Sequence, residues 1–347
     1  MLNTELKNIR TLSLSEIELY FETLNEKKFR AKQVYEWIWL KPVQDIDAMT
    51  NLSKELRQKL KSDFSLPALT IDTTQTSSDG TIKSRFKTFD NHFVEGVLIP
   101  TEERKTACVS SQIGCSLSCK FCATGYMKRE RNLNFDEIYD QVVMINNQSQ
   151  NVYEKKLSNI VFMGMGEPLL NYKNVLAAIE RITSPEGLGM SPRRITVSTA
   201  GVSKQIKQLG IDNVKFKLAL SLHAANDKKR HEIMAINDTN NIQSLVEALN
   251  YFYKQTQNEI TFEYILFKNF NDSLKDADEL IKLYRQVPAD LINVIEYNPI
   301  PFARFEKPEE AKLEGFVNHL AKNRVNVRIR RSRGKDIDAA CGQLANK

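Results

Sequence analysis

Alternating strand and helix patterns fill the chain after Pro100, and they constrain its fold more than any other feature. Short apolar runs alternate with longer segments whose apolar residues recur every three to four positions, as in buried strands and amphipathic helices. Repeated units of this kind form a parallel sheet covered by helices. The six strand runs predict an α/β fold with a partial (β/α)6 barrel rather than a closed barrel. The expected strands are 107–113, 159–164, 194–199, 214–222, 259–267 and 292–299.

The first 100 residues follow different patterns. Helical periodicity covers 12–24, 29–40 and 51–64, with Ser13 or Ser15, and Asn51 or Ser53, as candidate caps. Period-two alternation follows at 71–76, 81–89 and 92–100, with a turn signal at Ser78-Asp79-Gly80. We therefore expect four regions: a small helical accessory domain at 1–66, an antiparallel linker sheet at 67–101, the barrel at 102–334 and a C-terminal tail at 335–347.

Composition excludes some classes of protein. With 347 residues, 41% of them hydrophobic, the chain can bury one large core. No apolar run approaches the ~20 residues of a membrane helix. The net charge of +6 allows a polyanionic partner without requiring one. Because the chain opens MLNTELKNIR without an export leader, we expect a cytoplasmic protein with no membrane contact.

Three cysteines in the run GCSLSCKFCATG predict the chemistry. Cys115, Cys119 and Cys122 are separated by three and then two residues. Thiolates are the soft ligands of a 4Fe-4S cube, and a loop with three of them leaves one iron open to a small molecule. A structural zinc site needs four ligands, and no nearby second pair supplies the fourth. The total of five cysteines is odd and no leader is present, which argues against a disulfide framework.

Small and polar residues stand where the predicted strands end. These positions are Gly164-Met165-Gly166-Glu167-Pro168, Ser198-Thr199-Ala200-Gly201, Ser221-Leu222-His223 and Asn298-Pro299. Carboxyl ends of parallel strands meet at one rim, so these residues predict a pocket for a polar small molecule beside the cluster. Singly each signal is weak, and His223 is also consistent with an ordinary core histidine.

Longer motifs give the chain a specific resemblance. The cysteine loop and the GMGEP strand end resemble the radical S-adenosylmethionine (SAM) superfamily, whose open iron binds the amino and carboxylate groups of SAM. Residues 90–347 resemble the RlmN family, the dual-specificity methyltransferases of ribosomal and transfer RNA that act on carbon 2 of adenine. The motifs are VEGVLIP, CVSSQIGCSLSCKFCATG, VFMGMGEPLLN, SPRRITVSTAG, LSLHAANDKKRHEIM, EYNPIP and RGKDIDAACGQL.

The resemblance assigns cofactor sites residue by residue. It makes Cys115, Cys119 and Cys122 the ligands of one 4Fe-4S cluster. The positions that match family contacts to SAM are Gly166, Glu167, Ser198, Ser221, Leu222, His223 and Asn298. The chain departs from the family pattern at Ala225 and Ala235, where prolines are expected, which concerns loop geometry and removes no functional group.

The resemblance also assigns three catalytic residues. Cys341 matches the methyl-carrying cysteine, Cys108 its thiol partner and Glu95 the proton acceptor. In the family mechanism one SAM methylates the carrier cysteine, and a second yields a 5'-deoxyadenosyl radical that activates the methyl group for addition to adenine. The RNA remains bonded to Cys341 until the base is deprotonated and Cys108 attacks sulfur, forming a disulfide that must be reduced. Inert buried thiols are the alternative reading.

The same resemblance names the partners. It implies 23S ribosomal RNA (position 2503) and transfer RNA (position 37) as substrates, an electron donor such as flavodoxin, and a monomeric enzyme. Two basic clusters are candidates for phosphate contact: Lys27, Lys28, Arg30 and Lys32, and Arg324, Arg328, Arg330, Arg331, Arg333 and Lys335. A solvated charged face is the alternative. The tail must carry Cys341 to the cofactor, so we expect it to be mobile until cofactor or RNA binds.

Other activities fit less well. The related carbon 8 adenine methyltransferase of antibiotic resistance shares the cluster, both catalytic cysteines and DIDAACGQL. Pro168 in GMGEPLLN and the basic lead-in RRSRGKD favour carbon 2. A non-catalytic iron-sulfur electron carrier, or a radical enzyme that modifies protein, would leave Cys108 and Cys341 unexplained.

Overall fold

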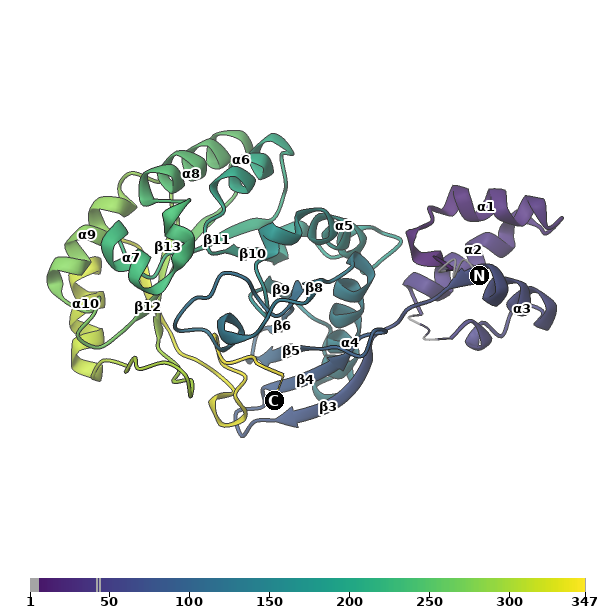
Figure 1. Cartoon of the computed structure of the whole chain (residues 1–347), viewed down its shortest axis with the longest axis horizontal. Coiled ribbons are helices and arrows are strands. Elements are labelled where there is room, and N and C mark those ends of the chain that lie inside the picture. The colour runs from purple at the N-terminus through teal and green to yellow at the C-terminus, as the bar shows by residue number, and fades with distance from the viewer. Residues whose placement is uncertain (1–5, 42, 44, 347) are drawn as a thin grey trace.

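The computed structural model describes residues 6–41, 43 and 45–346 of the chain, and its largest element is a curved ten-stranded sheet (Figure 1). Seven consecutive strands of this sheet pair in parallel. In spatial order they are β6 (Lys105–Cys108), β9 (Asn159–Phe162), β10 (Ile195–Thr199), β11 (Lys217–Ser221), β12 (Ile260–Leu266), β13 (Leu291–Glu296) and β14 (Val327–Arg330).

Helices follow each of the first six parallel strands. They are α4 (Phe135–Tyr153), α5 (Tyr172–Thr183), α6 (Ser203–Ile211), α7 (Asp227–Ile233), α8 (Ile242–Thr256), α9 (Leu274–Tyr284) and α10 (Glu310–Lys322). Figure 1 shows α6, α8, α9 and α10 along the outside of the sheet. Because β14 remains an edge strand, the barrel is open among the described residues, and the predicted partial (β/α)6 fold is confirmed.

Three antiparallel strands extend the other edge of the sheet. β3 (Thr70–Thr76), β4 (Ile82–Lys87) and β5 (Phe93–Pro100) pair in sequence, and β5 pairs with β6. The expected turn lies between β3 and β4, where Gly80 has φ +86° and donates its N–H to the Ser77 carbonyl at 3.0 Å. The strands expected as a linker are thus continuous with the barrel sheet.

The N-terminal helices form a separate small body, seen at one end of Figure 1. They are α1 (Leu14–Thr23), α2 (Lys28–Trp39) and α3 (Lys54–Asp63), flanked by the paired strands β1 (Lys7–Asn8) and β2 (Phe64–Ser65). Ser13 and Ser53 are the caps that the structure uses. Tyr139 on α4 donates its hydroxyl to the Trp39 carbonyl at 2.8 Å, which ties these helices to the barrel.

Short 3₁₀ helices complete the described elements. They are η1 (Ile9–Thr11), η2 (Ile46–Ala48), η3 (Ala123–Tyr126), η4 (Pro168–Asn171), η5 (Pro192–Arg194), η6 (Ala235–Asp238) and η7 (Lys335–Ile337). No helix in the described ranges combines the length and apolar character needed to cross a bilayer.

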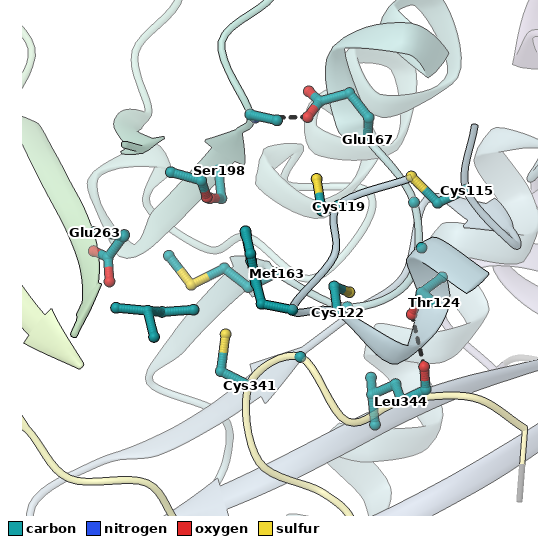
Figure 2. A pocket seen from close by; sticks show the side chains of 18 of the residues that line it. Cys115, Cys119, Cys122, Thr124, Met163, Glu167, Ser198, Glu263, Cys341 and Leu344 are labelled. Atoms are coloured by element: carbon teal, nitrogen blue, oxygen red, sulfur yellow. Dashed lines mark hydrogen bonds between the residues drawn. The ribbon is translucent and has the colours of Figure 1, made fainter. Parts of the chain in front are cut away.

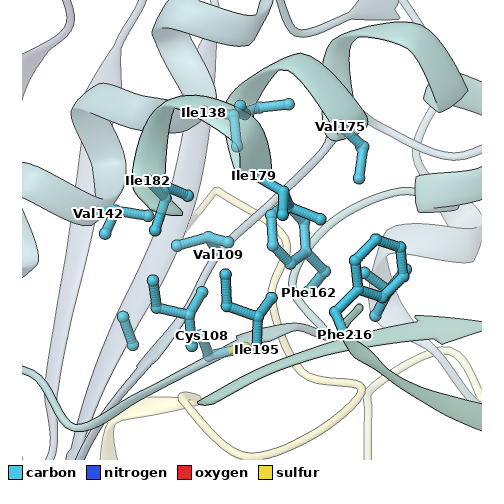
Figure 3. Close-up of a cluster of buried hydrophobic side chains, with 14 of the residues drawn as sticks. Cys108, Val109, Ile138, Val142, Phe162, Val175, Ile179, Ile182, Ile195 and Phe216 are labelled. Carbon is cyan, nitrogen blue, oxygen red and sulfur yellow. The ribbon is translucent and has the colours of Figure 1, made fainter. Parts of the chain in front are cut away.

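The core beneath the site lies between the sheet and helices α4 and α5 (Figure 3). Ile138 of α4 and Ile179 and Ile182 of α5 pack against sheet residues that include Phe162. Cys108 lies at the border of this cluster, with its side chain 8% exposed. The packed cluster therefore fixes the position of the first parallel strand from behind.

Replacing Ile182 by alanine should lower the free energy of unfolding by about 2–5 kcal/mol, because it leaves a cavity in this cluster. The measurement is urea-induced unfolding of the purified protein. Val152→Ala, at a site 55% exposed on α4, is the matched control and should change it by less than about 0.5 kcal/mol. Equal effects of the two substitutions would contradict the packing described.

Candidate functional site

A cavity opens at the carboxyl ends of the parallel strands, and residues from distant parts of the chain line it. Strand ends contribute Met163, Gly164, Ser198, Thr199, Ser221, Glu263, Ile295 and Arg330. The cysteine loop contributes Cys115, Cys119 and Cys122, and the C-terminal tail contributes Cys341. Of the strand-end residues expected at one rim, Gly164, Gly166, Glu167, Ser198, Thr199, Ser221 and His223 line this cavity, whereas Asn298 is not among its lining residues (Figure 2).

The cysteine loop is closed at its base by a two-stranded ribbon. β7 (Gln112–Ile113) pairs antiparallel with β8 (Arg131–Asn132), so the intervening segment projects as one loop. Gly125 lets this loop fold tightly, because a Cβ there would lie 2.6 Å from the Cys119 carbonyl oxygen. The Gly125 N–H donates to the Cys122 carbonyl at 2.9 Å. Backbone contacts inside the loop thus set the relative positions of the thiols.

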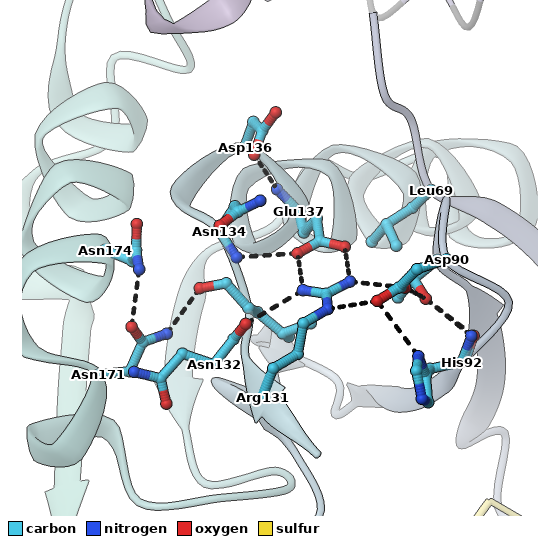
Figure 4. Close-up of polar contacts among 12 residues, drawn as sticks. Leu69, Asp90, His92, Arg131, Asn132, Asn134, Asp136, Glu137, Asn171 and Asn174 are labelled. Carbon is cyan, nitrogen blue, oxygen red and sulfur yellow. Dashed lines mark hydrogen bonds and ion pairs between the residues drawn. The ribbon is translucent and has the colours of Figure 1, made fainter. Parts of the chain in front are cut away.

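An ion-pair network anchors the C-terminal side of the loop's base, where β8 leads into α4 (Figure 4). The Arg131 guanidinium donates to Glu137 at the start of α4 (2.7 and 2.8 Å) and to Asp90 in the β4–β5 turn (2.6 and 2.8 Å). Two bidentate carboxylate pairs fix an arginine in orientation as well as in position. The end of the loop is therefore held between two neighbouring parts of the barrel.

The three loop thiols suit an iron-sulfur cluster by their chemistry. Burial raises the pKa of Cys115 to about 11 and raises that of Cys119 well above its usual range. Only a strong local positive charge, such as a bound cluster, would hold these groups as thiolates. Among the described residues no three His, Cys, Asp or Glu side chains converge on a single metal ion. In a cube each thiolate binds a different iron, so the donor set fits a cube better than one ion.

Glu167 is buried just before η4, in the segment that follows β9, and accepts two backbone hydrogen bonds. Its Oε1 accepts from Leu169 N–H at 3.0 Å and its Oε2 from Ala200 N–H at 2.7 Å. Burial raises the pKa of Glu167, whereas these N–H groups lower it. Each carboxylate oxygen has a second acceptor site, so the capacity to bind an ammonium group remains.

Ser198, Ser221 and His223 meet where β10 and β11 end. The Ser198 and Ser221 hydroxyls are 3.3 Å apart. Burial lowers the pKa of His223 to about 3, so the ring is neutral. Its Nδ1 accepts from the Ile265 N–H at 3.1 Å, which leaves Nε2 to carry the proton. This ring is therefore a hydrogen-bond donor beside the cavity that it lines.

At three other positions expected to contact SAM, the side chain is buried, absent or already hydrogen-bonded. The Leu222 side chain is fully buried in the core, so only its backbone is available. Gly166 has φ +92°, and a Cβ there would lie 2.4 Å from Cβ of Gln112, so packing against β7 requires glycine. The Asn298 amide donates to the Ser332 hydroxyl (2.9 Å) and to the Cys341 carbonyl (3.1 Å). Asn298 thus holds the tail in this structure.

The tail enters the cavity and is held through its backbone. Ala123 N–H donates to the Gly342 carbonyl at 2.7 Å, and the Thr124 hydroxyl donates to the Leu344 carbonyl at 2.7 Å (Figure 2). The Cys341 sulfur points toward the interior of the site in the same view. All five cysteines are free thiols; Cys108 is buried, which raises its pKa, whereas Cys341 is exposed.

Glu95 binds the end of the tail. This fully buried carboxylate on β5 pairs with Lys83 of β4 (3.3 Å) and accepts the backbone N–H groups of Ala345 (2.8 Å) and Asn346 (3.0 Å). It is not among the residues that line the cavity. In this conformation Glu95 therefore acts as an anchor for the tail.

Sequence reasoning missed several residues that build the site. Arg330, expected as an RNA contact, lines the cavity and pairs with Glu263 at 3.0 Å. Other members of its cluster also have internal partners, since Arg331 and Lys335 pair with Glu296. The available signal was Glu263 itself, a charged residue inside the otherwise apolar strand ITFEYIL.

Comparisons with known proteins agree with this geometry. Residues 7–66 match the ribosomal RNA large subunit methyltransferase N-terminal domain, and residues 109–283 match the radical SAM superfamily. A probable dual-specificity RNA methyltransferase RlmN from Cytophaga hutchinsonii is 55% identical, over 99% of this chain and 95% of that protein. The protein of the same name from Christiangramia forsetii is 54% identical, over 98% and 97%.

A solved structure extends the agreement to three dimensions. The crystal structure of a radical SAM methyltransferase from Sphaerobacter thermophilus matches with a TM-score of 0.92 and 37% identity, over 98% of this chain and 100% of that one. Fold and cavity together define a radical SAM methyltransferase, whose cofactors are a 4Fe-4S cluster and SAM. The chain belongs to the RlmN family of dual-specificity RNA methyltransferases, so the predicted family and cofactors are confirmed.

Replacing Glu95 by alanine should release the end of the tail. Hydrogen bonds to a charged group contribute about 1.5–3 kcal/mol, so amide protection in the C-terminal peptide should fall about tenfold or more. Hydrogen exchange with mass spectrometry of the full chain measures this. The double variant Lys83→Met/Glu95→Leu should lose the same amide protection, and it leaves no unpaired buried lysine. Glu310→Gln, a change at an exposed carboxylate, should leave the protection of the C-terminal peptide unchanged. Unchanged protection in both Glu95 variants would contradict the anchor.

Proposed function

We propose that this enzyme methylates carbon 2 of adenine in 23S ribosomal RNA, at position 2503, and in transfer RNA, at position 37. The observation that carries the proposal is the placement of Cys341. A residue near the end of the chain lies in the same cavity as the three-thiolate loop and Cys108. The relatives of this chain are named as RNA methyltransferases of dual specificity, which supports RNA as the substrate class.

In this proposal Cys115, Cys119 and Cys122 hold the cluster, and Glu167, Ser198, Ser221 and His223 contact SAM. When bound, the two cofactors supply the methyl group and the one-electron chemistry that an unactivated aromatic carbon requires. A carboxylate and neutral hydroxyl and imidazole groups suit the ammonium and ribose groups of SAM. Gly166, Leu222 and Asn298 contribute backbone or amide contacts at the same rim.

Cys341 carries the transferred carbon in this mechanism, and Cys108 ends the reaction. The adenine becomes bonded to the carbon on the Cys341 sulfur, and a base removes the ring proton. Glu95 is the residue that the resemblance assigns to this proton transfer. While the tail is docked, Glu95 binds its backbone, so Glu95 would have to release these contacts before it could reach the adenine. A Cys108 thiolate then forms a bond to the Cys341 sulfur as the sulfur-carbon bond breaks, the carbon leaves with the bonding electron pair and takes up a proton to become the methyl group, and reduction of the resulting disulfide restores both thiols.

The target base must leave its stack to reach this cavity. Two exposed aromatic rings stand beside the cysteine loop and the β13 end, where Tyr126 and Phe302 have ring centroids 5.4 Å apart. Aromatic side chains of this kind stack on unpaired bases. We include the N-terminal helical domain (1–66) in RNA binding, with the barrel (102–334) and tail (335–347) performing the chemistry.

Other aspects of the proposal follow from the substrates. Ribosomal and transfer RNA are cytoplasmic, so the enzyme acts there. A reduced flavodoxin-type protein is the proposed electron donor, and we propose that the enzyme acts as a monomer.

Product analysis tests the reaction directly. The protein is reconstituted anaerobically with iron and sulfide, then incubated with SAM, reductant and a ribosomal RNA fragment, and nucleosides are identified by mass spectrometry. We expect 2-methyladenosine. 8-Methyladenosine would assign the chain to the resistance-type activity. Absence of any RNA product, despite an intact cluster and SAM cleavage, would refute the substrate.

Variants of the two cysteines test the carrier mechanism. Cys341→Ala should form no methylated RNA, because no sulfur carries the carbon. Cys108→Ala should accumulate protein covalently bonded to RNA, because addition proceeds while release does not. Denaturing electrophoresis with labelled RNA detects this adduct. Formation of methylated RNA by Cys341→Ala would refute the methyl-carrier mechanism.

A further inference from the structure

One cation lines the cavity beside the two catalytic thiols and has no role in the function proposed above. Arg330, the last residue of β14, is half-buried, with its side chain 32% exposed. Among the described residues that line the cavity, it is the positively charged one, since His223 is neutral. Its place inside the barrel makes it unsuited to the external phosphate contact expected from the sequence.

The guanidinium of Arg330 is held by side-chain hydrogen bonds that link three adjacent strands. Its Nη1 donates to Glu263 Oε2 on β12 at 3.0 Å. The other oxygen of Glu263 accepts from the Asn293 amide on β13 at 2.6 Å. Glu263 is 4% exposed, so the pair forms in a region of low dielectric, where it is screened little. These bonds fix one end of the guanidinium and leave its charge beside the cavity.

Met163 lies in the same cavity wall as this arginine and Cys108. The Met163 sulfur accepts a hydrogen bond from Arg330 Nη1 at 3.5 Å. Arg330, Met163 and Cys108 therefore line one part of the site. Cys108 lies on β6 and Arg330 on β14, so the curvature of the sheet brings together strands from opposite ends of its parallel part.

The charges around Cys108 make a cation necessary for its reactivity. Burial raises the pKa of Cys108 to about 12, the thiol of Cys341 raises it further, and Arg330 lowers it. Glu263 stands behind Arg330, while Glu95 and Lys83 on the strands beyond β6 form their own ion pair. A buried thiol in such surroundings is unreactive unless a positive charge stabilises its thiolate.

We propose that Arg330, oriented by Glu263, is a positioning residue that stabilises the thiolate of Cys108 for the release step. The proposal rests on the role of Cys108 in the proposed function. Glu263 keeps the arginine in place while both cysteines are protonated. When Cys108 loses its proton, the single positive charge of the guanidinium attracts both the Glu263 carboxylate and the thiolate, which stabilises the thiolate without fully balancing the two negative charges.

The rate at which Cys108 forms a mixed disulfide with an added reagent tests this without turnover. The reconstituted protein, free of SAM and RNA, is treated with methyl methanethiosulfonate across a pH series, and the modification of each cysteine is followed by peptide mass spectrometry. The rate follows the thiolate fraction, so each unit of pKa is worth about tenfold. Arg330→Met should slow modification of Cys108 by about tenfold or more at a fixed pH and move its profile to higher pH.

Matched variants separate charge from folding. Arg331→Met removes the neighbouring exposed arginine and should change the Cys108 rate by less than roughly twofold. Arg330→Lys should restore much of the rate, because the charge is kept. Arg330→Met/Glu263→Gln removes both members of the pair, so it should fold without an unpaired buried carboxylate and should still be slow. An Arg330→Met protein that reacts like wild type, or an Arg330→Lys protein as slow as Arg330→Met, would overturn the proposal.

Adduct analysis distinguishes this proposal from the function on which it rests. If Cys108→Ala accumulates the RNA adduct, Arg330→Met should accumulate it too, and more strongly at lower pH. Accumulation in Cys108→Ala but not in Arg330→Met would overturn the role of Arg330 and leave the function standing. Absence of the adduct in Cys108→Ala would instead refute the release mechanism, and with it the purpose assigned to Arg330.

Discussion

Parallel pairing from β6 to β14 is the constraint on which the site depends. Because every strand in this part of the sheet runs the same way, all the carboxyl ends face one rim, and each helix returns the chain to the opposite edge. Residues more than 200 positions apart, such as Cys108 and Arg330, therefore line one cavity. Sheet curvature supplies the second requirement, since a flat sheet would separate its first and last strands.

The tail shows how a segment can be placed while its reactive side chain stays free. Bonds from Ala123, Thr124, Asn298 and Glu95 all reach tail backbone groups rather than the Cys341 side chain. Each neutral hydrogen bond contributes only about 0.5–1.5 kcal/mol net, so a few of them hold the segment without making its release slow. This arrangement suits the carrier role proposed for Cys341, in which the sulfur contacts a cofactor, a base and then another thiol.

The fold was largely predictable, because six apolar strand runs and the helices between them leave few alternatives for a chain of this length. The cavity-lining cysteines and the serine and histidine strand ends were predictable for the same reason. The roles of Glu95 and Asn298 as tail anchors were not, because they depend on where a C-terminal segment docks, and no local pattern encodes this. Arg330 was misread as an external residue, since alternation gives the face of a strand but not whether that face is the inside of a barrel.

Two ion pairs with buried carboxylates flank the thiols, and stability alone does not explain them. Lys83–Glu95 and Arg330–Glu263 both place charges where apolar residues would fold at least as well, because desolvation offsets most of the attraction. The first pair contacts the tail, and the second lies in the cavity that Cys108 and Cys341 line. The carboxylate of the first binds backbone N–H groups that would otherwise lack partners, and the cation of the second faces sulfur atoms whose reactivity depends on losing a proton. The charges are therefore best understood as part of the chemistry, and the apolar core behind β6 supplies the stability that lets the barrel hold them.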